Sequence, residues 1–219
     1  MTHFPGSPKI LKGAIVGIDI FNPISSVAIF QYNPEQLSRS VSPQYSQAGG
    51  GSSETLRLSG PPRETISASI SLDLTDQMEK GEAGPLKAGL TGNLAALEML
   101  VYPKSLLVAA NQILLATGTM EVIPPMAPLT LFIYGWNRVV PVKIDNLSIS
   151  ETAHDPSLNP IRADVDLGMT VLTYNDLPLT HPGYWTFLAH QVVKETLATV
   201  ASANNIGAAL GEEVDVFSL

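Results

Sequence analysis

The sequence contains no cysteine. This absence excludes disulfide scaffolds, zinc sites built on thiolates, and catalysis by a thiol nucleophile. Charged residues are also scarce, since Asp, Glu, Lys and Arg together make up only 15% of the 219 residues, against about a quarter in an ordinary soluble protein. A surface this poor in charge is typical of a protein whose faces are covered by neighbouring subunits.

Long apolar runs and an excess of positive charge are missing as well. The most apolar stretch, Ser105 to Leu115, is interrupted by Asn111 and Gln112 and is too short to span a bilayer. Residues 1–12 contain no apolar core of a secretory signal, so we expect a protein that is cytoplasmic when it is made and has no membrane partner. The net charge of −8 and the isoelectric point near 4.9 argue against a nucleic acid as partner.

What the sequence does contain is turn residues and short strand-like segments. Its 17 Gly and 17 Pro predict many turns. Apolar residues make up 45%, which is enough to build a core in one large domain or two small ones. Segments rich in β-branched and aromatic residues, several of them bounded by Asn-Pro, predict strands. These segments are 14–20, 27–32, 65–75, 129–134, 138–150 and 162–174.

Apolar and polar residues alternate most clearly in residues 65–75, which predicts a half-buried strand with one solvent-facing or partner-facing side. In residues 138–150 the alternation changes parity, because Val140, Val142 and Ile144 are even-numbered whereas Leu147 and Ile149 are odd-numbered. One extra residue at Asp145-Asn146 restores the facing, so we predict a β-bulge there.

Helical periodicity appears in two places. In residues 93–102 four apolar side chains share one helical face, and Pro103 ends the pattern. Residues 105–115 are compatible either with a further helix or with irregular buried chain. The second helix is predicted over 184–200, just after Pro182. It presents a stripe at helical spacing made of Tyr184, Leu188 and Val192, with Trp185 beside them.

Together these segments predict a mainly β fold of the α+β class, with six or seven strands, a helical insertion at about 92–116 and a C-terminal helix. We expect one β domain over residues 1–178, followed by the C-terminal helix and an acidic tail over residues 179–219. The Gly-rich and Ser-rich stretch 46–54 is predicted to be a flexible loop. The acidic end, residues 211–219, is predicted to be frayed or bound to a partner.

A search for chemistry-bearing patterns finds none. The four histidines have no metal-ligand spacing, and the pair His154-Asp155 before Pro156 favours a turn. Asp164 and Asp166 face the same side of a strand, but Arg162 shares that side, which favours a solvated face. We therefore expect no catalytic residue, no metal site and no cofactor, and we do not expect an enzyme.

Three blocks of sequence carry a resemblance. The segment 30–39 reads Phe-Gln-Tyr-Asn-Pro-Glu-Gln-Leu-Ser-Arg, and Pro61-Pro62-Arg63-Glu64 leads into the alternating strand. The third block runs from Pro141 to Ala163 and includes His-Asp-Pro-Ser-Leu-Asn-Pro. Together with residues 128–132, in this order and spacing, they resemble the tube-protein-domain family of contractile injection systems over roughly residues 14–178. The matching family resembles the baseplate hub or tube adaptor of phage tail-like particles, the counterpart of the LysM-bearing baseplate wedge protein of phages.

The resemblance implies a tube-like β-barrel or β-sandwich that repeats as a hexameric ring in a phage tail-like particle, which can be released from the cell. The implied partners are the inner tube, the spike and hub proteins, the baseplate wedge proteins and further copies of the chain. Many relatives append a LysM module, whereas residues 178–219 here offer one helix and an acidic tail. In place of a LysM module, we expect a C-terminal helix that docks on a neighbouring baseplate protein. The candidate interface residues are Tyr32, Asn33, Pro34, Leu37, Arg39 and Trp185.

Two alternatives remain open at this point. The same fold can serve as an adaptor at the tube end or cap side of the particle. A peptidoglycan-binding or carbohydrate-binding module is the second alternative, because Trp136 and Trp185 could stack on sugars. For Asn33-Pro34 a turn that ends a strand is as reasonable as contact with a partner.

Overall fold

The computed structural model of the chain describes residues 11–18, 26–30, 32–34, 36–46, 56–75, 89–116 and 127–210, with the backbone alone for Ser26 and residues 203–210. Most of the predicted loop at 46–54 and the whole acidic tail at 211–219 lie outside these ranges. The division into a β domain and a C-terminal segment stays a prediction.

Seven strands form one antiparallel sheet in the order β2-β1-β5-β6-β7-β4-β3. This confirms the mainly β expectation. The strands are β1 Ala14–Ile18, β2 Ser26–Ile29, β3 Leu37–Ser42, β4 Arg63–Asp73, β5 Leu129–Ile133, β6 Val139–His154 and β7 Pro160–Val171. Six match predicted segments, and β3 was not predicted as a strand. No pairing joins β2 to β3 within the described ranges, so both strands are edges there.

The alternation predicted for residues 65–75 is present in β4, whose side chains are buried from Glu64 to Leu72 at every second position. The β-bulge is confirmed too. Ile144 in β6 pairs with Met169 in β7, and the next pair is Asn146 with Gly168, so Asp145 is the extra residue. The side chain of Asp145 accepts a hydrogen bond from the Thr170 hydroxyl and lies 2.9 Å from the Lys143 ammonium.

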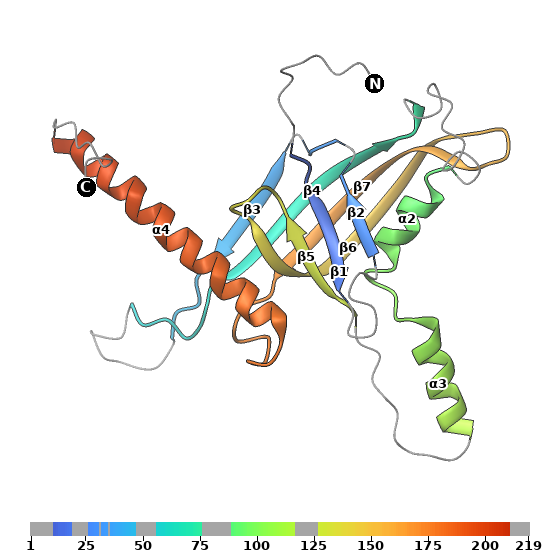
Figure 1. Cartoon of the computed structure of the whole chain (residues 1–219), viewed down its shortest axis with the longest axis horizontal. Helices are drawn as coiled ribbons and strands as arrows, with labels where there is room; N and C mark the ends of the chain where they lie inside the picture. The colour runs from blue at the N-terminus through green and yellow to red at the C-terminus, as the bar shows by residue number, and fades with distance from the viewer. Residues whose placement is uncertain are drawn as a thin grey trace.

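The sheet is curled around its core (Figure 1). All seven strands of the described ranges belong to it, and no second sheet packs on it there. Although β2 and β4 are five places apart in the sheet, Ala28 and Ile70 line the same small cavity. Phe30 and Phe132 contact each other in the core, with ring centroids 6.2 Å apart. Of the two implied forms, the curled sheet corresponds to the barrel, with its edges left open.

The helical insertion between β4 and β5 consists of α2, Thr91–Glu98, and α3, Ser105–Ala116. Helix α2 packs against β2 and buries Leu94 and Leu97, as its periodicity predicted. Helix α3 has no buried residue. Of the two possibilities for residues 105–115, the helix is therefore right and the irregular buried chain is wrong.

The C-terminal helix is α4, Pro182–Leu210, and begins at the proline that marked its start in the sequence. Its sheet-facing side differs from the apolar stripe in the sequence. The buried residues are Gly183, Phe187 and His190, whereas Val192 of the stripe is 57% exposed. The side with Gly183 faces inward because the helix backbone there lies very close to Leu177. A Cβ at this position would be only 2.7 Å from Leu177 Cδ1. Figure 1 shows α3 and α4 leaving the sheet in different directions, α4 toward the left and α3 toward the lower right.

Candidate assembly surface

Asn33 and Pro34, two of the candidate interface residues, lie against the start of β1. The Asn33 side chain accepts a hydrogen bond from the Gly13 amide at 2.9 Å and donates one to the Leu11 carbonyl at 2.8 Å. Pro34 is buried. These contacts tie two chain segments together within one molecule, which favours the turn interpretation of Asn33-Pro34. Tyr32 beside them is exposed.

The candidates Leu37 and Arg39 both lie on edge strand β3. Leu37 pairs with Ala68 of β4 and packs partly against the core. Arg39 points to Glu64, whose Oε1 accepts hydrogen bonds from Arg39 Nε at 2.8 Å and from Nη2 at 2.5 Å. Sequence reasoning found Arg39, but it missed Glu64.

Glu64 joins β3 and β4 to helix α4. Its second oxygen, Oε2, lies 3.0 Å from Lys194 Nζ on α4, and the residue is only 5% exposed. Burial by itself would raise the pKa of the Glu64 carboxyl, but hydrogen bonds from Lys194 and Arg39 outweigh this effect, and the pKa lies below its usual value. One buried carboxylate thus links α4 to both β4 and the edge strand β3.

A groove lies next to this charged contact, between α4 and the turn that connects β5 to β6. It has a volume of about 430 Å³ and is lined chiefly by Trp136, Val139, Trp185, Ala189 and Val193, with His190 at the sheet side. Burial lowers the pKa of His190, and the Lys194 ammonium lowers it further, so the ring is neutral near pH 7.

The two tryptophans of this groove come from distant parts of the chain. Trp136 is 85% exposed and follows Gly135, which adopts a φ of 76° in the β5–β6 turn. Trp185 is also exposed, and its indole N–H donates to the Leu179 carbonyl at 3.1 Å. The structure brings the candidate Trp185 together with Trp136, but the groove lining includes none of the candidates from residues 32–39.

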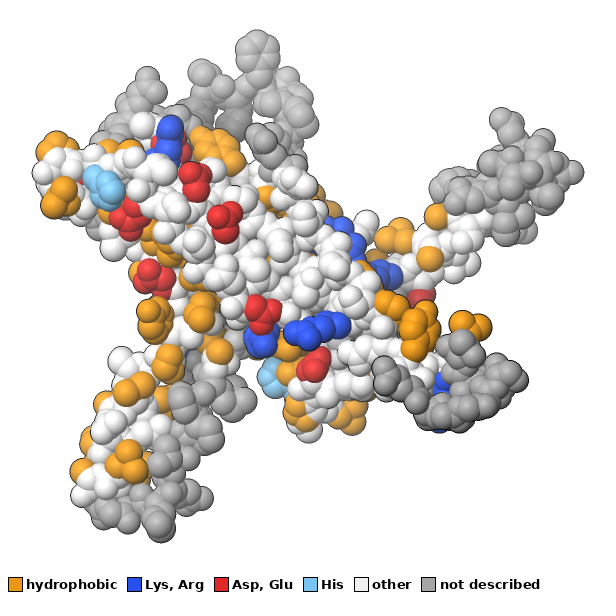
Figure 2. Space-filling model, turned by 180° about the vertical axis from the view of Figure 1, so that it is seen from behind, with side chains coloured by type: hydrophobic (Ala, Val, Ile, Leu, Met, Phe, Trp, Pro, Cys, Tyr) orange, Lys and Arg blue, Asp and Glu red, His pale blue; other side chains and the backbone are white. Residues whose placement is uncertain are grey.

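Apolar side chains are exposed at both edges of the sheet and on both projecting helices. On the edges they are Val27 and Ile29 in β2 and Val41 in β3. On α3 they are Leu106, Val108, Ile113 and Leu115. Figure 2 shows hydrophobic side chains spread along the α3 arm at the lower left. Such a distribution is typical of surfaces that neighbouring molecules cover.

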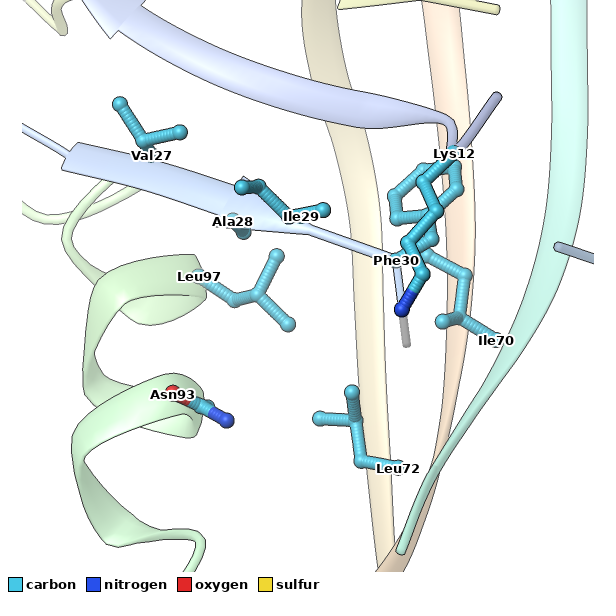
Figure 3. A pocket seen from close by; sticks show the side chains of 9 residues that line it. All are labelled: Lys12, Val27, Ala28, Ile29, Phe30, Ile70, Leu72, Asn93 and Leu97. Atoms are coloured by element: carbon cyan, nitrogen blue, oxygen red, sulfur yellow. The ribbon is translucent and has the colours of Figure 1, made fainter. Parts of the chain in front are cut away.

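A cavity of about 290 Å³ lies between β2, β4 and α2 (Figure 3). Val27, Ile29, Leu72 and Leu97 are among the apolar side chains that line it. Lys12 and Asn93 contribute the polar groups among the described residues around it. The arrangement offers an apolar gap beside an edge strand and no pair of acid and base groups within the described lining.

Other polar groups that stood out in the sequence are engaged locally. The Asp155 carboxylate accepts hydrogen bonds from the Ser157 and Asn159 amides at 2.7 and 2.8 Å, which confirms a turn at this place. Arg162, expected to offset Asp164 and Asp166, forms its ion pair with Asp73. The Asp164 carboxylate accepts a hydrogen bond from the Ser71 hydroxyl, and its charge adds to the effect of Asp73 in raising the pKa of Arg162.

Within the ranges described, no group of three or more His, Asp or Glu side chains is placed to hold a metal ion. No helix in the described part of the chain is long and apolar enough to cross a lipid bilayer.

Comparison with known proteins gives little that is specific. No family model matches the chain, and no curated protein matches it. Among solved structures, the chain is similar to the tail of an empty gene transfer agent (GTA) particle determined by helical refinement with C6 symmetry, at 12% identity and a TM-score of 0.29. The match covers 72% of this chain and 90% of that chain. A likeness this low carries no conclusion about function.

Proposed function

We propose that this protein is a structural subunit of a contractile injection particle, in which copies form a ring in the baseplate that links the spike hub and inner tube to the surrounding wedge. The observation that supports this most is the apolar surface exposed on both sheet edges and on both projecting helices of a chain with only 15% charged residues. The sequence blocks that resemble the tube-protein-domain family support the same assignment.

The geometry of the sheet is suited to ring assembly. An edge strand presents unpaired backbone N–H and C=O groups that can pair with another chain. Here β2 and β3 lie at opposite edges of one sheet and differ in sequence. Contacts between two different surfaces of identical subunits are head-to-tail, and they produce rings when the rotation closes.

The proposed partners are therefore further copies of the chain in a hexameric ring, the inner tube, the spike and hub proteins and the wedge proteins. The protein would act by binding and by holding geometry while the sheath contracts. In this role it would be synthesised in the cytoplasm and incorporated into the particle.

The test is negative-stain electron microscopy of particles from the producing cell with and without this chain. We expect complete particles to be lost without it, leaving free tubes or spikes, and to be restored by the wild-type chain. Intact, contractile particles in its absence would overturn the proposal. A label fused to the chain then distinguishes the baseplate from the cap end of the tube.

A carbohydrate-binding module is a second candidate, favoured by the two exposed tryptophans that line one groove. Aromatic faces are suitable surfaces for sugar rings. A pull-down on insoluble peptidoglycan tests it with the wild-type chain and a Trp136→Ala/Trp185→Ala variant. Retention of the wild-type chain together with loss of retention in the double variant would favour this candidate over the ring subunit.

A further inference from the structure

Helix α3 exposes an apolar surface away from the core of its own chain. None of its twelve residues is buried, and Leu106 is 79% exposed. Residues 105–116 include no charged side chain. A short exposed helix with this composition gains little from its own chain, because most helical stability in proteins comes from packing of an apolar face.

A second apolar surface of comparable length lies on α4. Trp185, Ala189, Val192 and Val200 are exposed and share one side of the helix, which is not the side that packs on the sheet. At its start this stripe joins the groove beside Trp136. Helical rise gives about 24 Å for residues 185–200 and about 18 Å for the twelve residues of α3.

We propose that α3 of one copy packs along this α4 stripe of a second copy, with apolar side chains of α3 inserted between Trp136 and Trp185. The inference deepens the proposed function and rests on it for the presence of many copies side by side. The described side chains that line the groove include no Asp, Glu, Lys or Arg, and α3 has none either. The twelve residues of α3 are thus short enough to lie along the stripe, and no charged side chain of the described groove lining loses its water when α3 enters the groove.

The placement of the two surfaces excludes a contact between them within one chain. Figure 1 shows α3 and α4 leaving different sides of the sheet, so α3 does not lie along α4 of its own chain. Each copy then offers one helix and one groove, which is a heterologous contact that repeats from copy to copy. Apolar helices that meet in this way pack through ridges and grooves at interaxial distances of about 8–10 Å.

The absence of cysteine from the chain makes the contact directly testable by cross-linking. Leu106→Cys and Val193→Cys are made in separate batches of the full chain, mixed, and oxidised. We expect a cross-linked heterodimer at a yield at least fivefold above that of Leu106→Cys mixed with Val41→Cys, which places the second thiol on β3. Equal yields for the two mixtures would overturn the contact.

A non-covalent test uses two variants that each lose one half of the contact. A Leu106→Asp/Ile113→Asp variant keeps the groove, and a Trp136→Ala/Val193→Asp variant keeps α3. By analytical ultracentrifugation each variant alone should associate less than the wild type does, and mixing the two variants should restore association, because each then supplies the half that the other has lost. Leu158→Ser, on the β6–β7 turn, is the control and should assemble as the wild type does.

The failure of this contact is distinguishable from failure of the proposed function. If both charged variants still assemble as the wild type does, the α3–α4 contact is overturned while the ring subunit stands. If particles are intact without the chain, the ring subunit is overturned by the microscopy, whichever result the cross-linking gives.

Discussion

At the residue scale, Glu64 adds an ionic link between α4 and the sheet to the packing of buried Phe187 and His190. The Glu64 side chain is almost fully buried, and its carboxylate forms ion pairs with Arg39 of β3 and Lys194 of α4. A buried carboxylate is tolerated only when such partners compensate for the water it loses. None of these three residues is close to the others in sequence, so no local pattern could have shown the contact.

Glu64→Gln removes the charge but keeps the shape of the side chain. We expect it to lower the free energy of unfolding by about 1–3 kcal/mol, because Arg39 and Lys194 are half-exposed and regain part of their hydration. Urea denaturation measures this loss. Glu195→Gln, an exposed position on the same helix, is the matched control and should change stability by less than about 0.5 kcal/mol.

Two ionisable groups, Glu64 and His190, give stability a predictable pH dependence. Folding lowers the pKa of Glu64, so its stabilising effect is present above its unfolded pKa and is lost as the pH falls through the lower folded value. Folding also lowers the pKa of His190, so stability falls as the pH drops from the ordinary pKa of histidine toward the folded one, because the ring gains its proton more readily in the unfolded chain. We therefore expect the midpoint of urea unfolding to fall between pH 7 and pH 4. A midpoint that rises over this range would contradict both assignments.

Leu158 is the non-glycine residue with a positive φ in the described ranges, at 65°. It lies in the turn between β6 and β7, where Asp155 accepts two backbone hydrogen bonds. Because a leucine is strained in this conformation and its side chain is exposed, Leu158→Gly should stabilise the protein by about 0.5–1 kcal/mol. An unchanged or lower thermal midpoint would show that the turn carries no such strain.

At the element scale, the sequence predicted best those strands that are buried on one side. The alternation in β4 and the parity change in β6 are local patterns, and both led to correct predictions, including the bulge at Asp145. Strand β3 was missed because Leu-Ser-Arg-Ser-Val-Ser has little apolar content, and an edge strand buries little of it. The buried side of α4 was missed because apolar residues occur on several sides of that helix, and only the contacts of Gly183 and Lys194 select one.

Substitutions in β4 and β3 separate folding from assembly. Ile70 is buried in the core, and Ile70→Asp should abolish folding because a charge would be buried without a partner. Val41 is exposed on the edge strand, and Val41→Lys should leave the thermal midpoint within a few degrees while reducing particle yield. Circular dichroism measures folding, and microscopy of complemented cells measures yield. Normal yields with folded Val41→Lys would remove β3 from the assembly surface.

At the scale of the whole molecule, the features that distinguish this chain are its open edges and its projecting helices. A curled sheet with a conventional core accounts for folding, but it leaves apolar side chains exposed on β2, β3, α3 and α4. The low content of charged residues had indicated that neighbouring molecules cover part of the surface. The sequence could not indicate where the exposed surfaces lie, since the placement of α3 and α4 depends on contacts between residues far apart in the chain.

The central claim, that the protein is a repeated structural subunit of a particle, is tested most directly by counting it. Purified, intact particles from the producing cell would be analysed by quantitative mass spectrometry with labelled peptides of this chain and of the spike protein. The account predicts that the chain co-purifies with the particles in a constant number of copies consistent with a hexameric ring. Particles that are complete and contractile but contain none of this chain would contradict it.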